Sequence, residues 1–125
     1  MTDTPPPIET TQAAAPGMAK ISYDQFMEVD LRVAEVRAAE KVEKSKKLMK
    51  LTVFTGDDER TIVAGIAAKY TPEEMVGRKI VIVANLQPAK LMGVESNGML
   101  LAASIDGEPS LIAVDPNVPA GTKVK

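Results

Sequence analysis

The sequence predicts an all-β fold with little helix: a five-stranded Greek-key barrel with a short helix between the third and fourth strands. Three observations predict it. Short apolar or alternating runs recur along the chain at strand length. Turn-forming Gly, Pro, Asn and Asp residues separate those runs. A strong helix-start signal falls between the third and fourth runs.

Composition places the chain among globular domains and disfavours catalysis. It has 125 residues, of which 45% are hydrophobic and 26% charged, as expected for one domain. The absence of His and Cys removes the usual general base and the thiol nucleophile. We expect no cofactor, no metal site and a cytoplasmic location. No apolar run reaches the roughly 20 residues that span a bilayer, so no membrane partner is expected.

Two segments precede the predicted barrel. Residues 1–20 are rich in Pro, Thr and Ala without an apolar period, which predicts a disordered linker or tail before a domain at 21–125. Ser22 followed by Gln25 predicts a capping box and a short helix. Phe26 and Val29 are expected to face inward from it.

The first three strands are predicted at 31–42, 48–55 and 60–66. In the second strand the alternation predicts one inward face, formed by Met49, Leu51 and Val53. Residues 56–59 form the turn of the hairpin that follows. Gly65, inside the third run, suggests a bulge or a close backbone approach.

The second half of the chain begins with the helix signal Thr71-Pro72-Glu73-Glu74, in which Thr71 caps and Glu74 completes the box. Strands are predicted at 79–84 and 98–104. A turn at Asp106-Gly107 leads to another strand at 110–114, and a turn-rich end returns to a last extended piece. This order of elements is that of an OB-fold with a C-terminal extension.

In an OB-fold the loops between strands one and two and between strands four and five flank the ligand face. The first of these loops holds a basic cluster with one acidic residue, Glu43, among Lys41, Lys44, Lys46, Lys47 and Lys50. Because these lysines cluster in a loop that flanks the expected ligand face, they indicate contact with phosphates, although the formal net charge of the chain is −2.

The second loop, residues 85–98, mixes hydrogen-bonding, charged and apolar side chains with two glycines that shape its backbone. Either it carries function, or it is a structured hairpin loop with Leu91 and Met92 tucked into the core. Aromatic residues make up only 3% of the chain, which favours a structured RNA over generic single strands as ligand. Phe54 could stack on a base, or it could pack under a loop or at a subunit contact.

Five motifs carry a resemblance to a known family: "DLRVAEV", "KKLMKLTVFTG", "TIVAGIAAKY", "VGRKIVIVANLQPAKLMGVESNGMLLAA" and "PAGTKVK". They resemble the C-terminal tRNA-binding domain of bacterial methionyl-tRNA synthetase, a type also found as a free structure-specific tRNA-binding protein and in endothelial monocyte-activating polypeptide. The resemblance covers about 21–125 and implies an OB-fold, homodimerisation through the C-terminal segment and tRNA binding largely independent of sequence.

By position, the resemblance implies tRNA contacts at Asn85, Lys90, Ser96, Met99 and, in the first loop, Lys47. This chain departs from relatives at Lys44-Ser45-Lys46, so Lys46 or Lys47 could fill the first-loop role, and Lys47 aligns better because Leu48 follows it. Lys46, Lys47 and Lys50 are all candidate phosphate contacts, and we expect the tRNA-contacting side chains of the second loop to be exposed.

The predicted function is a non-catalytic module that binds tRNA and dimerises in the service of a methionyl-tRNA synthetase body, either as its C-terminal domain or as a separate subunit. A free-standing tRNA-binding protein and a peptide-binding export chaperone of the same fold are the alternatives. A five-stranded barrel closes without residues 105–125, whose apolar side chains must be buried somewhere. The predicted dimer interface comprises Leu111, Ile112, Val114 and Val118.

Overall fold

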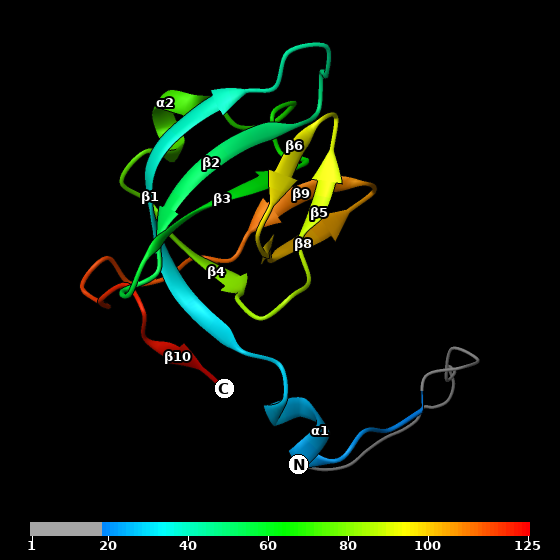
Figure 1. Cartoon of the computed structure of the whole chain (residues 1–125), viewed down its shortest axis with the longest axis vertical. Coiled ribbons are helices and arrows are strands. Elements are labelled where there is room, and N and C mark those ends of the chain that lie inside the picture. The colour runs from blue at the N-terminus through cyan, green and yellow to red at the C-terminus, as the bar shows by residue number, and fades with distance from the viewer. Residues whose placement is uncertain (1–18) are drawn as a thin grey trace.

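The computed structural model describes residues 19–125 (Figure 1). Residues 1–18 of the predicted disordered tail lie outside the described part, so that prediction stays a prediction. None of the helices within 19–125 is long and apolar enough to cross a membrane.

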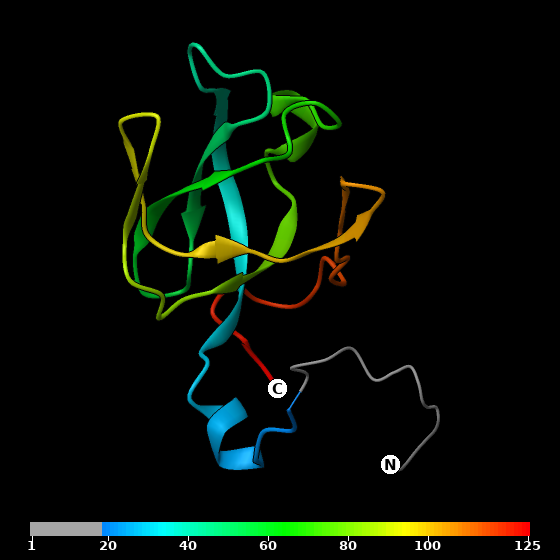
Figure 2. The same cartoon turned by 90° about the vertical axis from the view of Figure 1, so that its right-hand side faces the viewer.

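An antiparallel sheet of six strands forms the body of the molecule (Figures 1 and 2). Its strands follow the order β3-β2-β1-β4-β7, with β10 paired to the start of β1. The bounds are β1 Leu31–Lys41, β2 Met49–Phe54, β3 Glu59–Ala64, β4 Lys79–Val83, β7 Met99–Leu100 and β10 Lys123–Val124. The two ends of the path approach each other where a Cβ on Gly98 would lie 3.3 Å from Ile62 Cδ1. The OB-type barrel predicted from the sequence is confirmed.

The long strand β1 bends the sheet into this barrel. Its first half pairs with β4, and its second half pairs with β2. The register shifts between Val36 and Ala38, a bulge at Arg37 that sharpens the local twist. Inside, the predicted face of β2 is fully buried: Met49, Leu51 and Val53 are each 0% exposed. Apolar residues of the facing strands complete the core, including Ile62, Ile80 and Ile82.

Both predicted helix starts are confirmed. In α1 (Tyr23–Met27) the Ser22 hydroxyl and Gln25 form a capping box, and Thr71 and Glu74 form one in α2 (Pro72–Met75). Met75 of α2 is 0% exposed and packs into the core beside β1. The prediction that Phe26 and Val29 face inward is wrong: they are 37% and 41% exposed. The reason is that α1 lies beyond the end of the barrel and not over it (Figures 1 and 2).

The second predicted loop contains a hairpin of its own, formed by β5 (Ala89–Leu91) and β6 (Val94–Ser96). The predicted strand at 98–104 is divided, because its first part pairs with β4 as β7, whereas its second part, β8 (Ala102–Ile105), leaves the barrel and pairs with β9 (Glu108–Leu111). Asp106 and Gly107 form the β8–β9 turn with φ of 52° and 83°.

Gly65 also departs from its prediction. Strand β3 ends at Ala64, so Gly65 lies after the strand and not within it. A Cβ built on Gly65 would have no heavy atom within 4 Å, so no close backbone approach explains this glycine.

Candidate nucleic-acid interface

A serine organises the loop between β1 and β2. The Ser45 hydroxyl accepts hydrogen bonds from the backbone N–H groups of Lys47 at 3.3 Å and Leu48 at 3.1 Å. Lys44 occupies a left-handed conformation with φ of 71°. Lys44, Lys46 and Lys47 are exposed. The loop is therefore fixed by its own backbone contacts, and its lysine side chains remain available to a ligand.

A two-residue turn closes the hairpin β5–β6. Met92 and Gly93 both have positive φ, 51° and 81°, as a type I′ turn requires. Leu91 is 39% and Met92 57% exposed, so the interpretation that places them in the core is wrong. Leu91 ends β5 and Met92 begins the turn, so both lie at the tip of the hairpin, whose other end packs against β3.

The base of this hairpin is fastened to β3. The Ser96 hydroxyl accepts a hydrogen bond from Val63 N–H at 2.9 Å and donates one to the Gly98 carbonyl at 3.1 Å. Ser96 is 4% exposed, so the expectation of an exposed side chain is wrong there. Gly98 has φ of +136°, and a Cβ would lie 2.9 Å from the Val83 carbonyl oxygen, so only glycine fits without strain.

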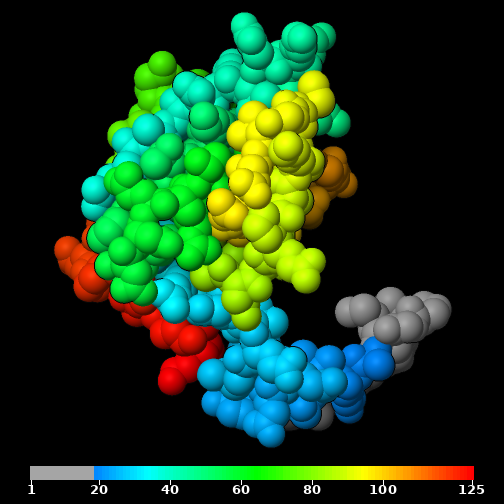
Figure 3. Space-filling model, viewed as in Figure 1, coloured from blue at the N-terminus to red at the C-terminus, as the bar shows by residue number. Residues whose placement is uncertain are grey.

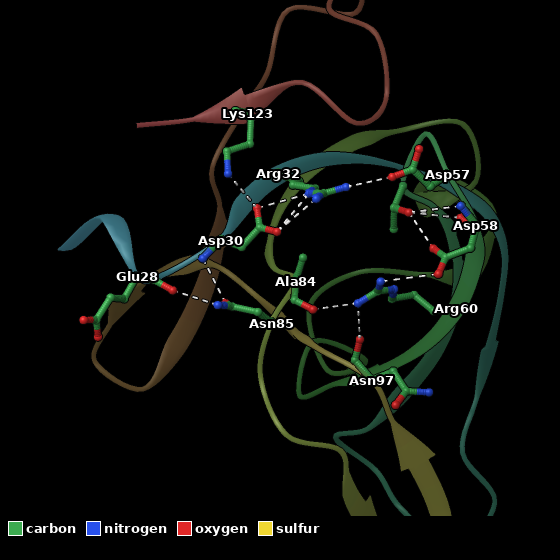
Figure 4. Close-up of polar contacts among 11 residues, drawn as sticks. Glu28, Asp30, Arg32, Asp57, Asp58, Arg60, Ala84, Asn85, Asn97 and Lys123 are labelled. Atoms are coloured by element: carbon green, nitrogen blue, oxygen red, sulfur yellow. Dashed lines mark hydrogen bonds and ion pairs between the residues drawn. The ribbon is translucent and has the colours of Figure 1, made fainter. Parts of the chain in front are cut away.

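Arg60 on β3 ties the two ends of the segment together (Figure 4). Its Nη1 donates to the Ala84 carbonyl at 2.7 Å and to the Asn97 carbonyl at 3.3 Å, and its Nη2 lies 3.4 Å from Asp58 Oδ2. The strand exit at Ala84 and the hairpin exit at Asn97 are thus held by one side chain, which sets the direction in which the hairpin points.

Asn85 links the same segment to the N-terminal helix (Figure 4). Its Oδ1 accepts from Asp30 N–H at 2.9 Å, and its Nδ2 donates to the Glu28 carbonyl at 2.7 Å. Both polar groups of this exposed side chain are therefore engaged within the protein.

The two loops meet at a groove of about 490 Å³. It is lined by Glu40, Lys41, Val42, Glu43, Lys44, Lys50, Met92 and Val94. In the space-filling view the β1–β2 loop lies directly beside the tip of the hairpin (Figure 3). The lining thus combines three lysines and two glutamates with apolar side chains, among them Met92 and Val94 of the hairpin. Such a groove can take a ligand that carries both negative charge and an apolar surface.

Comparison with known proteins assigns the family. The family model described as "Putative tRNA binding domain" matches residues 31–123. The chain belongs to the tRNA-binding domain family. This confirms the resemblance to the methionyl-tRNA synthetase domain that the sequence motifs indicate.

Relatives of this tRNA-binding domain include the methionine–tRNA ligase of Deinococcus radiodurans, which is 53% identical over 131 residues. That match covers 100% of the chain and 19% of the ligase, so the chain spans about a fifth of that relative's length. Among solved structures, a MetRS-related protein from Pyrococcus horikoshii matches with a TM-score of 0.83 and 46% identity, covering 86% of this chain and 100% of its own. The chaperone CsaA from Bacillus anthracis matches with a TM-score of 0.78 and 28% identity, with the same coverage.

The predicted contact residues of the tRNA-binding domain fall into separate groups. Lys50 lines the groove, and its Nζ lies 3.8 Å from Glu40 Oε2. Lys46 and Lys47 are exposed on the adjoining loop but are not among the lining residues. Lys90 is exposed on β5, and Met99 is 47% exposed on β7. The structure therefore brings both loops together but spreads the predicted side chains along them.

Phe54 packs within the domain on at least one side. The Arg37 guanidinium carbon lies 4.4 Å from the centroid of its ring, a cation–π contact. Because Arg37 is the residue at the β1 bulge, the bulge places this guanidinium over the neighbouring strand. This arrangement favours the packing role that the sequence left open for Phe54.

Two aspartates near the other end of the barrel serve as anchors. The hydrogen bond from Arg32 holds the pKa of Asp30 below its usual range, with further help from the charges of Arg32 and Lys123 and against the effect of burial. The Thr55 hydroxyl, 2.6 Å away, is the main cause that lowers the pKa of Asp58. Within residues 19–125 no group of three or more His, Cys, Asp or Glu could hold a metal ion.

Sequence reasoning missed several residues of this interface. Lys41 and Lys44 were recognised as part of the basic cluster but not singled out, although both line the groove. Ser45 and Arg60 were not identified as organising residues. Ser45 carried a usable signal, because a serine in a loop commonly accepts hydrogen bonds from following backbone N–H groups. Arg60 carried none, since its partners are carbonyls 24 and 37 residues away.

The predicted dimer residues lie on and after β9. Leu111 is half-buried, packs against the core, and its N–H donates to the Tyr70 hydroxyl at 3.1 Å. Ile112 is 44% exposed, and Val114 and Val118 are half-buried. Ile105, at the end of β8, is 61% exposed. An apolar surface is thus present on this extension.

Proposed function

We propose that the chain is a non-catalytic module that binds tRNA and forms a homodimer, serving the catalytic body of a methionyl-tRNA synthetase in the cytoplasm. The observation that carries the proposal is the lysine-lined groove between the two loops, in a chain that belongs to a tRNA-binding family. Those lysines suit a phosphate backbone, which they neutralise without reading base sequence.

The proposed contacts divide into two kinds. Lys46, Lys47, Lys50 and Lys90 supply positive charge to phosphates, and exposed Met99 supplies an apolar contact to a ribose or base. Asn85 and Ser96 support the site from within. Their polar groups already hold α1 and β3, so a direct bond to RNA would require those contacts to be given up.

The link to a synthetase body rests on the relatives, since the chain matches about a fifth of a methionine–tRNA ligase. Whether joined covalently or held as a subunit, a module that holds tRNA near a catalytic body raises the local tRNA concentration. That lowers the apparent KM for tRNA without a new contact at the reacting atoms. A free-standing tRNA-binding protein would use the same surface without the body.

A peptide-binding chaperone is the second candidate, favoured by the similarity to CsaA and by exposed Leu91 and Met92 on the hairpin. Charge separates the two candidates. An apolar peptide has no need of Lys41, Lys44 and Lys50 around Met92, whereas an RNA backbone does.

A competition titration tests the proposal. Labelled tRNA is titrated with the chain and then challenged with unlabelled tRNA, duplex DNA and an unfolded polypeptide. We expect saturable binding that unlabelled tRNA displaces and that the other two displace poorly. Equal displacement by the polypeptide would favour the chaperone. Absence of tRNA binding at low salt, where phosphate contacts are strongest, would overturn the proposal.

A further inference from the structure

Met92 occupies a conformation that its side chain does not favour. It is the first residue of a two-residue type I′ turn and has φ of 51°. Asn, Asp and Gly dominate this turn position, because L residues with longer side chains are strained in the left-handed region. Gly93, with φ of 81°, satisfies the preference at the second position, but Met92 does not. A methionine here adds nothing to the turn.

Core packing does not account for Met92 either. The residue is 57% exposed, in the turn at the tip of the hairpin, which lies beside the β1–β2 loop (Figure 3). Met92 lines the groove together with Val94, and Lys41, Lys44 and Lys50 line the same groove from the end of β1, the β1–β2 loop and β2. In the β1–β2 loop, Lys44 also has a left-handed backbone, with φ of 71°. Both sides of the groove thus hold a non-glycine residue in a strained conformation, a feature that clusters at ligand sites.

The charges of the groove favour a phosphate. Lys50 is engaged with Glu40 at 3.8 Å. Within residues 19–125, Lys41 and Lys44 form no such ion pair, although Glu43 also lies on the lining. A volume of about 490 Å³ falls in the range of sites that enclose a small ligand, about 300–1,000 Å³.

We propose that Met92 is a base-contacting residue and that the groove takes one unpaired nucleotide of a bound RNA, with its phosphate at Lys41 and Lys44 and its base against Met92 and Val94. The inference rests on the proposed function and deepens it. A base inside a helix exposes only its edges, so a face against the thioether requires a base that has left the stack. A flexible, polarizable methionine suits any base, in keeping with binding that does not depend on sequence.

The decisive variant is Met92→Asn, because Asn-Gly is the preferred sequence of this turn. The change removes the apolar contact while it keeps or improves the hairpin. Leu91→Asn is the matched control, since Leu91 is exposed on the same hairpin but is not among the groove-lining residues. Affinities for tRNA and for a blunt RNA duplex are measured over a range of salt, with melting temperatures on the same preparations.

We expect Met92→Asn to lower tRNA affinity about five- to tenfold, because part of the apolar surface that the methionine buries against the base is lost. The slope of log affinity against log salt and the melting temperature should not change. Duplex affinity should not change, and Leu91→Asn should bind tRNA like the parent. If Met92→Asn does not fold, the same affinities are measured for Met92→Ala.

Parental tRNA affinity in the Met92 variant, or equal losses on tRNA and duplex, would overturn the inference while leaving the proposed function intact. A loss confined to binding of an unfolded polypeptide would overturn it as well. If the parent chain itself binds no tRNA, the proposed function fails instead.

Discussion

Ser96 shows how a motif residue can support a binding site from inside the protein. Its place in "ESNGM" suggests a ligand contact, yet the side chain is buried, and the hydroxyl joins β3 to the hairpin exit. The sequence could not reveal this, because Val63 is 33 residues away. Lys90, on the partner strand of the same hairpin, is exposed as expected.

Ser96→Ala should therefore destabilise the fold. The change leaves Val63 N–H without its partner in a buried place, which costs about 1–3 kcal/mol. Lys90→Ala is the control and should stay within about 0.5 kcal/mol of the parent, as exposed substitutions usually do. Denaturant unfolding of the three proteins measures this. If Ser96→Ala unfolds at the same denaturant midpoint as the parent, the Ser96 hydroxyl does not stabilise the junction between β3 and the hairpin.

At the scale of elements, capping and alternation signals were reliable, whereas the Gly65 signal and the strand pairings were not. The capping boxes at Ser22 and Thr71 and the inward face of β2 were predictable because each depends on residues a few positions apart. The hairpin β5–β6 was missed as a pair of strands because Met92-Gly93 lacks the usual Asn-Gly signature. The predicted fifth strand is divided because only its first part, β7, pairs with β4, whereas β8 pairs with β9. This change of partner depends on residues far apart in the sequence, so no local pattern predicts it.

The extension formed by β8, β9 and the residues after them carries the prediction of a dimer. Ile105 and Ile112 are 61% and 44% exposed there, and a two-fold contact would bury them. Light scattering at micromolar concentration should give the mass of two chains. Ile112→Lys should reduce that mass toward one chain, because a charge would be buried in the contact.

Leu86→Lys is the control for this experiment. Leu86 is 47% exposed on the loop between β4 and β5, outside the extension. It should leave the mass unchanged. A parent chain that scatters as a monomer, or an Ile112→Lys variant that stays dimeric, would contradict the placement of the interface.

At the scale of the whole molecule, the barrel topology brings two loops to one mouth although they are about 40 positions apart in the sequence. That convergence was predictable from the order of elements. Which lysines line the groove was not, since it depends on how Ser45 and left-handed Lys44 turn the loop. Lys41 and Lys44 line it with Lys50, whereas Lys46 and Lys47 extend the positive surface beside it.

The salt dependence of tRNA binding tests most directly whether this surface neutralises phosphates. The variant carries Lys46→Ala, Lys47→Ala and Lys50→Ala, and the control carries Lys20→Ala and Lys125→Ala, outside the β1–β2 loop. The slope of log affinity against log salt should fall by about 0.7–0.9 for each phosphate that is no longer neutralised, uniformly across tRNA species. The control should keep the parental slope. An unchanged slope and affinity in the triple variant would contradict the account.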